Sequence, residues 1–377
     1  MNILHQIGYC ILFILFIGCK KQTQNNGLIS LEYDFNKLEN VSIWDLFEID
    51  QVIELNLDAT GHYVYPVSKI FLAEDDSTFI VYSRDIYQKL VYVYRGGPRY
   101  ESINRWGGYD GIYDFSGVTD CQVYNDSIYL LDYLKNKVRI YDLNMVEGRS
   151  ILLPYSYRSF NLLGGKTVVF DTDGLSNGSN DDHEVAILSR TTGSLLSFLT
   201  VNSNPYLQMG IESERYSNTI GDKCYYVRQY DPCIYQIDGN LESISAQFCI
   251  TFHPDRFISI KTEDDLNNLA RSVSEESGIF RYFCPIQSQK GFGIFISNST
   301  IFEKYFLWIQ GNDIVGFNIV EKDLLGNLPL NAVWGSRFAA FLEQDNTKAR
   351  NLLSDKVELN DKKDYVIIYR LGAKFSN

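Results

Sequence analysis

The side chains best suited to binding a ligand lie in the stretch Tyr94–Tyr113. Within it, Arg99, Arg105, Trp106 and Tyr109 follow one another closely in a chain that is acidic as a whole. Aromatic faces combined with guanidinium groups suit sugars, carboxylates and the hot spots of protein interfaces. These four residues are therefore predicted to bind a ligand. The alternative is a long connection between structural repeats, with its aromatic side chains packed inside.

The chain offers little for histidine-based chemistry. Beyond His5 it has only His62, His183 and His253, none of them at the H-x-x-x-H or H-E-x-x-H spacing of a zinc site. The G-x-S-x-G turn of a serine hydrolase and the glycine-rich phosphate-binding signatures are also missing from the sequence. We therefore predict no catalytic residue, no cofactor-binding residue and no metal ligand from motifs. Oxygen ligands gathered from several distant segments stay open as a route to a metal site.

The acidic stretch Asp171–Asp182, DTDGLSNGSNDD, suggests calcium because it begins like an EF-hand loop. However, Leu175 occupies the third ligand position, and the last residue is Asp182 where the motif needs glutamate. A solvated hairpin loop is the better interpretation, and no cofactor is expected there.

Cysteine usage does not predict a disulfide framework. Apart from two near the N-terminus there are five cysteines, an odd number, and no pair has C-x-x-C spacing. Cys224 and Cys233 flank a turn at Asp231-Pro232, but pairing outward from that turn does not bring them opposite each other. They are predicted not to bond, and small buried thiols are the expected state of all five. The five are Cys121, Cys224, Cys233, Cys249 and Cys284.

One cysteine, Cys19, has a specific predicted chemistry. It follows an uncharged apolar run, Ile7–Ile17, about half as long as a membrane-spanning helix requires and typical of a signal peptide. The run ends in the letters FIGC, which resemble the lipobox of bacterial lipoproteins, in which the cysteine is acylated and becomes the new N-terminus. Residues 1–18 are thus predicted to be a lipoprotein signal peptide. Residues 19–30 are predicted to be a lipidated flexible tether.

The resemblance to a lipobox implies an exported protein that is held in a membrane through its N-terminal lipid. The outer membrane is expected, and the leaflet stays open. The alternative is an ordinary secretory signal with an incidental cysteine, since the region before the apolar run has no lysine or arginine.

The charge of the chain argues against nucleic acid as a partner. The formal net charge is −13, and residues 1–18 contain no acidic or basic side chain, so the mature part keeps all of it. Nucleic-acid binding depends on lysine and arginine neutralising phosphates. The 27 tyrosines and 23 phenylalanines instead favour β-strands.

The elements that must carry these residues repeat one pattern: an apolar strand, a polar turn and a second strand. The clearest copy is Ser127–Leu143, SIYLLDYLKNKVRIYDL. Copies begin about 40 to 70 residues apart, near or above the length of a propeller blade. We predict one all-β domain over residues 31–373, a β-propeller with short helical insertions at Thr262–Val273 and Thr347–Leu353. The other copies are Thr78–Tyr94, Lys166–Leu188, Lys223–Ile237 and Gly291–Trp308.

Three segments carry a family resemblance: the acidic and apolar opening Val41–Ser83, the blade Ser127–Leu143 and the closing strand Lys363–Leu371. Together they resemble the six-bladed β-propeller lipoproteins of Bacteroides and its relatives, a family distantly similar to NHL-repeat propellers. The family's glycine-rich turn is present only in part, at Gly107–Tyr113. The resemblance implies six blades and a last strand that completes a blade begun by N-terminal residues. It implies no single activity.

These observations favour an envelope-anchored propeller that acts as a non-catalytic binding or scaffolding module for a protein or glycan. The alternative is a metal-dependent propeller lyase or hydrolase with its site at the central channel. A third possibility is a structural subunit of an envelope complex, which a broad exposed apolar patch would mark. Three or more oxygen ligands meeting at the channel would favour the enzyme.

Overall fold

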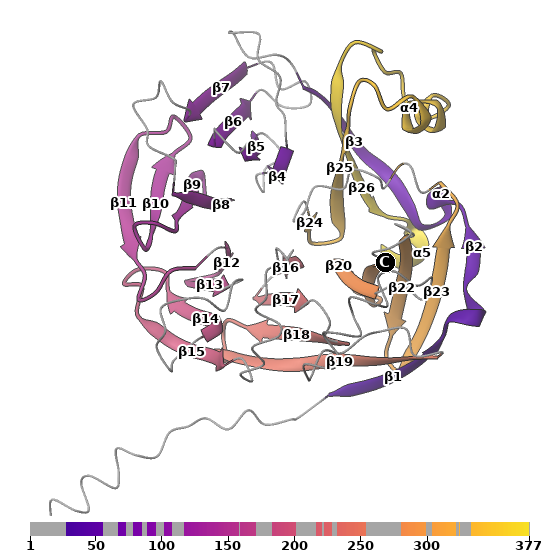
Figure 1. Ribbon diagram of the computed structural model, residues 1–377, viewed down its shortest axis with the longest axis horizontal. Helices are drawn as coiled ribbons and strands as arrows, with labels where there is room; N and C mark the ends of the chain where they lie inside the picture. The colour runs from indigo at the N-terminus through magenta and orange to yellow at the C-terminus, as the bar shows by residue number, and fades with distance from the viewer. Residues whose placement is uncertain are drawn as a thin grey trace, which may run out of the picture.

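The strands of the computed structural model form six sheets arranged around a centre, as Figure 1 shows. The all-β, six-bladed propeller predicted from the sequence is therefore confirmed. We number the blades in chain order from the sheet that begins with β4. The structure describes residues 28–55, 67–72, 78–84, 89–95, 102–107, 117–157, 159–170, 183–200, 216–220, 222–227, 232–253, 280–298, 304–321, 324 and 333–376.

Each blade is built from successive antiparallel strands, with the first strand nearest the centre (Figure 1). Blade 1 holds β4 (Val67–Leu72), β5 (Thr78–Arg84), β6 (Lys89–Arg95) and β7 (Ser102–Gly107). Blade 2 holds β8 (Val118–Tyr124), β9 (Ser127–Asp132), β10 (Lys137–Asp142) and β11 (Glu147–Leu152). Blade 3 holds β12 (Ser159–Leu163), β13 (Lys166–Phe170), β14 (His183–Ser189) and β15 (Leu195–Thr200).

The second half of the ring follows the same plan. Blade 4 holds β16 (Tyr216–Ile220), β17 (Lys223–Val227), β18 (Cys233–Asp238) and β19 (Ser243–His253). Blade 5 holds β20 (Phe280–Gln287), β21 (Phe292–Asn298), β22 (Lys304–Gln310) and β23 (Asp313–Ile319). Blade 6 holds β24 (Val333–Trp334), β25 (Arg337–Leu342), β26 (Asp364–Leu371) and the N-terminal strand β3 (Phe47–Leu55). All five hairpins expected from the sequence are present.

The middle strands of the blades are apolar on both faces because neighbouring blades cover both. In β9, every residue from Ile128 to Asp132 is buried. The same is true of Phe338–Leu342 in β25. Strands buried on both faces read as continuous apolar runs, which is the pattern that predicted them.

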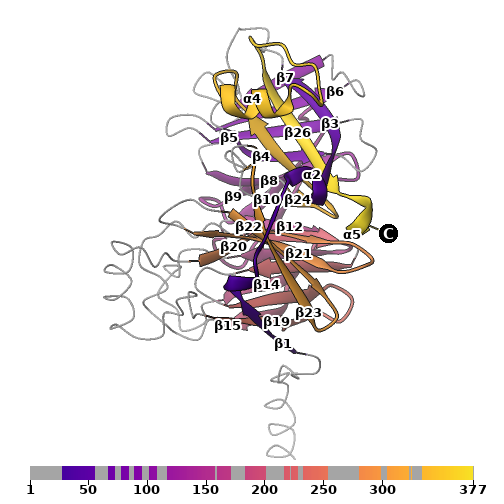
Figure 2. The same ribbon diagram turned by 90° about the vertical axis from the view of Figure 1, so that its right-hand side faces the viewer.

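The N-terminal segment crosses the outside of the ring before it enters a blade (Figure 2). Strand β1 (Ile29–Asp34) pairs in parallel with β19, and β2 (Glu39–Val41) pairs in parallel with β23. The 3₁₀ turn η1 (Phe35–Lys37) and helix α2 (Ile43–Leu46) separate these strands from each other and from β3. We call residues 29–46 the strap. It covers the outer edges of blades 4 and 5, which would otherwise present unpaired backbone groups.

The ring closes by pairing the two ends of the chain. Strand β3 lies antiparallel to β26 over the whole length of β26, so blade 6 contains residues from both ends. Phe47 at the start of β3 holds the junction, because its ring lies 4.9 Å from that of Phe338 and 5.6 Å from that of Phe295. The predicted completion of a blade by the C-terminal strand is confirmed.

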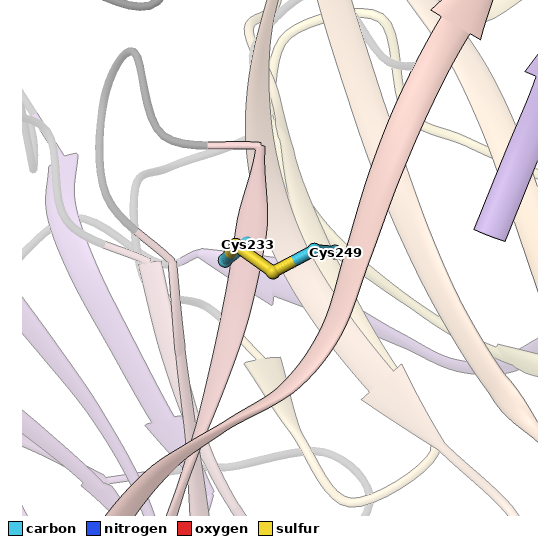
Figure 3. The surroundings of a disulfide bond; sticks show 2 residues. All are labelled: Cys233 and Cys249. Atoms are coloured by element: carbon cyan, nitrogen blue, oxygen red, sulfur yellow. A yellow bond between two sulfur atoms is a disulfide. The ribbon is translucent and has the colours of Figure 1, made fainter. Parts of the chain in front are cut away.

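A disulfide joins β18 and β19 of blade 4, between Cys233 and Cys249 (Figure 3). The expectation of buried thiols is therefore wrong for these two cysteines and right for Cys121 and Cys224, which are buried and form no disulfide. Cys224 lies opposite Ile237, so the prediction that it does not bond to Cys233 is confirmed.

Among the two helical insertions expected, Thr347–Leu353 is present as α4, with Asn346 as its N-cap. The other, Thr262–Val273, lies outside the described residues. A last short helix, α5 (Ala373–Ser376), follows β26 and packs Phe375 against Trp308. None of the helices described here combines the length and the apolar content needed to cross a membrane.

Candidate functional site

The centre of the ring is lined by the first strands of the blades (Figure 1). Three of these strands, β8, β12 and β16, place polar side chains against the next blade. These polar side chains are Asp120 and Gln122 on β8, Asn161 on β12, and Asn218 on β16. Asp120 and Asn218 are 0 % and 1 % exposed, so each must find its hydrogen-bond partners inside the protein.

The polar side chains of β8 join blade 2 to blade 3. The Asp120 carboxylate accepts hydrogen bonds from the backbone N–H of Cys121 at 2.6 Å and from that of Phe160 at 2.9 Å. Gln122 donates from Nε2 to the carbonyl of Phe160 at 3.0 Å and to the side-chain oxygen of Asn161. The Asp120 carboxylate thus accepts one backbone N–H from its own strand and one from the first strand of blade 3.

Asn161 continues the chain of contacts from blade 3 to blade 4. Its Nδ2 donates to Ser217 Oγ at 2.7 Å and to Cys224 Sγ at 3.2 Å. Burial raises the pKa of the Cys224 thiol to about 11, partly offset by the Asn161 contact. At neutral pH this thiol is protonated, so Cys224 is not an activated nucleophile.

Asn218 ties three blades together. Its Nδ2 donates to the carbonyl of Pro285 in blade 5 at 2.8 Å and to the carbonyl of Gly335 in blade 6 at 2.9 Å. Its Oδ1 accepts from the N–H of Gly335 at 3.1 Å. Strand β16 thus reaches the turn between β24 and β25 directly, and the amide of Asn218 bridges the inner strands of blades 4, 5 and 6.

This arrangement favours structural bonding at the centre of the ring over metal binding. Nowhere in the described residues do three histidine, cysteine, aspartate or glutamate side chains lie close enough together to hold a metal ion. All four polar groups named above, three amides and one carboxylate, are hydrogen-bonded to a neighbouring blade. The neighbouring blade orients each of these side chains, and their hydrogen bonds in turn hold the blades together.

The predicted ligand-binding residues fall in two places. Arg105 and Trp106 lie on β7, the outermost strand of blade 1, at positions opposite Tyr92 and Val91 of β6. Part of the stretch that the sequence analysis also considered as a long connection between repeats is therefore a strand, β7. Arg99 and Tyr109 lie outside the described residues, and so does Cys19. Whether these residues bind a ligand or a lipid stays a prediction.

The other sequence candidates are dispersed. The acidic stretch Asp171–Asp182 and His62 lie outside the described residues. His183 begins β14. His253 ends β19, where its Nε2 lies 3.8 Å from Glu32 of the strap.

The inner-strand polar residues were not recognised from the sequence. Asp120, Asn161 and Asn218 each occur in a short strand among apolar and hydroxyl residues, with no motif around them. Their shared role depends on which strand lies nearest the centre, and only the sheet order fixes that.

The comparison with known families decides what kind of propeller this is. Residues 21–287 match the family described as a 6-bladed beta-propeller, DUF5128. The chain belongs to this family. No curated protein matches the sequence.

Solved structures share the fold of this propeller at low sequence identity. A candidate exported protein of Bacteroides fragilis superposes with a TM-score of 0.61 at 13 % identity, over 92 % of this chain and 99 % of that one. A DUF4221 family member from Bacteroides vulgatus gives a TM-score of 0.49 at 9 % identity, over 86 % and 98 % of the two chains. Virginiamycin B lyase from Staphylococcus aureus gives 0.45 at 10 % identity, over 77 % and 80 %. The last two likenesses are too slight to bear on function.

Proposed function

We propose that this DUF5128 propeller is an exported lipoprotein, anchored through Cys19, that acts as a non-catalytic binding or scaffolding module for a protein or glycan of the cell envelope. The observation that carries the non-catalytic part is the use of the inner-strand side chains. Asp120, Asn161 and Asn218 are engaged by neighbouring blades, so these buried groups are not available to a substrate or metal ion.

Export is supported by the disulfide between Cys233 and Cys249. Disulfides form and persist in oxidising compartments such as the periplasm and the cell surface. The apolar run before Cys19 and the similarity to a candidate exported protein point the same way. Anchoring rests on the lipobox-like residues that end in Cys19.

Anchoring is tested by growing cells that express the full chain with an alkynyl fatty acid. We expect the label on the wild-type protein and none on Cys19→Ser. A wild-type protein that is exported and cleaved but carries no label would contradict the anchoring.

Binding is tested with residues 20–377, the mature chain without its lipidated cysteine, against a panel of envelope glycans and envelope proteins. We expect Trp106→Ala to weaken capture about tenfold, as hot-spot aromatics do, without lowering the melting temperature. Equal loss of capture and of thermal stability would mean that Trp106 only supports the fold. Turnover of a glycan that needs an added divalent metal and stops with a chelator would favour the lyase or hydrolase instead.

A further inference from the structure

The outer strand of blade 3 is apolar and exposed. Strand β15 has the sequence LLSFLT, without a charged residue. Leu195, Leu196 and Phe198 are 36 %, 37 % and 47 % exposed. Single exposed apolar side chains are ordinary, but three within four residues of one strand form a patch.

A turn of blade 4 that is held against blade 3 carries a further exposed apolar side chain. Leu241, in the turn between β18 and β19, is 66 % exposed. The next residue, Glu242, forms an ion pair with Lys166 of β13, which holds this turn against blade 3. We call Leu195, Leu196, Phe198 and Leu241 the rim patch.

The rim patch differs from the outer edges of the blades on either side of it. Strand β11 of blade 2 exposes two charged residues, Glu147 and Arg149, and charges of this kind keep sheet edges from associating. Strand β19 of blade 4 is covered by β1 of the strap. Strand β15 has no charged residue, and among the described residues no strand pairs beyond it.

The rim patch lies on the side of the ring where the strap begins. Strands β15, β19 and β1 lie together along one edge of the molecule in Figures 1 and 2, and β15 contacts β19. Ile29, the first residue of β1, lies beside Phe248, five residues along β19 from Ser243. Ser243 and Phe248 are therefore about 17 Å apart along β19. Leu28, directly before β1, is itself 41 % exposed.

The position of Cys19 in the chain limits how far the rim patch can lie from a membrane. Ile29 lies ten positions after Cys19, and a fully extended chain over that distance spans at most about 35 Å. A lipid on Cys19 would therefore hold the start of β1 close to the bilayer. A link of this length gives an effective concentration on the order of millimolar, at which weak apolar contacts become occupied.

We propose that the rim patch docks onto the lipid bilayer that holds Cys19, so that blades 3 and 4 rest on the membrane and blades 1 and 6 face away from it. This proposal rests on the proposed anchoring. A bilayer fits the patch better than a second copy of the chain, because each copy carries a net charge of −13. A bilayer also accepts apolar side chains from a strand and from a turn alike, and it needs no continuous row of backbone hydrogen bonds.

The test uses a probe on β15, between Leu196 and Phe198 of the rim patch, and a matched probe across the ring. Residues 20–377, with a histidine tag at the N-terminus, are attached to phosphatidylcholine vesicles containing a chelator lipid, so natural acylation is not needed. Ser197→Cys on β15 and, separately, Asn351→Cys on α4 carry a fluorophore, and nitroxide lipids serve as the quencher. Helix α4 lies across the ring from β15 (Figure 1). We expect at least about twofold more quenching at residue 197 than at residue 351.

Two variants connect the quenching to the apolar side chains. The double variant Leu196→Asp and Phe198→Asp should reduce quenching at residue 197 to the level of residue 351. Leu352→Asp on α4 is the matched control, since Leu352 is also 36 % exposed, and it should change nothing.

Three results would overturn the proposal: equal quenching at the two probes, quenching at residue 197 that survives the double variant, or a dimer in solution that the double variant dissociates. The last result would assign the patch to a second copy. Because the chelator lipid replaces the natural anchor, failure here is distinct from a failure to label Cys19 with fatty acid.

Discussion

Asn218 illustrates how single buried side chains organise this propeller. Its amide meets two carbonyls and one N–H, from blades 5 and 6, and so uses both its donors and its acceptor. The inner-strand amides therefore hold the blades in register around the centre.

Replacing Asn218 with alanine should destabilise the protein by about 2–4 kcal/mol, because Pro285 and Gly335 lose their buried partners. Asn218→Asp should cost more at neutral pH, since a carboxylate would face the two carbonyl oxygens. Those carbonyls raise the pKa of the new carboxyl in the folded state, so the extra cost should shrink as the pH falls toward about 4. Urea unfolding at several pH values measures both effects.

The control for this prediction is Asn240→Ala. Asn240 is exposed and its side chain donates to Asp222 at 2.8 Å. Its loss should change stability by no more than about 0.5 kcal/mol. If Asn218→Ala cost no more than Asn240→Ala, the bridging role of Asn218 would be wrong.

Tyr33 makes the strap sensitive to alkaline pH. It lies on β1 with its hydroxyl against Gly316 of β23, where a Cβ atom would come within 2.1 Å of that oxygen. Burial, with smaller contributions from the charges of Asp34 and Glu39, raises the pKa of Tyr33 from 10.0 to about 12. The folded state thus favours the neutral phenol. The stability it contributes is complete below pH 10 and is lost as the pH rises from 10 through 12.

Tyr33→Phe should therefore be nearly neutral at pH 7 and less sensitive to base. Between pH 10 and 12 the wild type should lose about 1–2 kcal/mol more unfolding free energy than the variant. The difference between the two proteins isolates Tyr33 from the other buried tyrosines. Parallel curves for the two proteins across this range would contradict the assignment.

Among the secondary-structure elements, the hairpins were predictable from the sequence, whereas the strap and the disulfide between β18 and β19 were not. The polar turn between two apolar runs located β9 and β10, and the helix expected at Thr347–Leu353 is α4. The strap was missed because its parallel pairing joins residues more than 200 positions apart, as in Ile29 beside Phe248. No local pattern records such a contact.

The disulfide was missed for a related reason. Pairing outward from the turn, with Asp238 opposite Ser243, would place Cys233 beside Phe248. An irregularity between Ile234 and Tyr235 shifts the register by one residue and brings Cys233 opposite Cys249. A β-bulge of this kind has no reliable signature in the residue types that flank it.

Removing the disulfide should weaken blade 4. The two cysteines lie 16 residues apart, and closing a loop of that size contributes about 3 kcal/mol in the chain-entropy description. We expect Cys233→Ala with Cys249→Ala to lose most of that amount in urea unfolding. Reducing the wild type should produce the same loss. Reductant should leave the stability of the double variant unchanged, and an effect on the double variant would point to another disulfide.

At the scale of the whole molecule, β3 closes the ring and the strap covers part of its outside, and these two roles can be separated. Strand β3 completes blade 6 by pairing with β26, whereas the strap covers the outer edges of blades 4 and 5 and buries apolar side chains against them. Glu321 connects the strap to the end of blade 5, accepting hydrogen bonds from Ser42 Oγ at 2.9 Å and Ile43 N–H at 2.8 Å.

A chain that begins at Phe47 keeps β3 but lacks the strap, and a chain that begins at residue 56 lacks both. The first should still unfold in one cooperative step, at a lower midpoint, and should self-associate because the edges of β19 and β23 are uncovered. The second leaves β26 without its partner and Phe338 without Phe47, so the ring should lose its cooperative transition altogether. Thermal melts and size-exclusion chromatography distinguish the two. If both truncations behaved alike, closure by β3 would not be what holds the ring together, and the strap would have to carry that role.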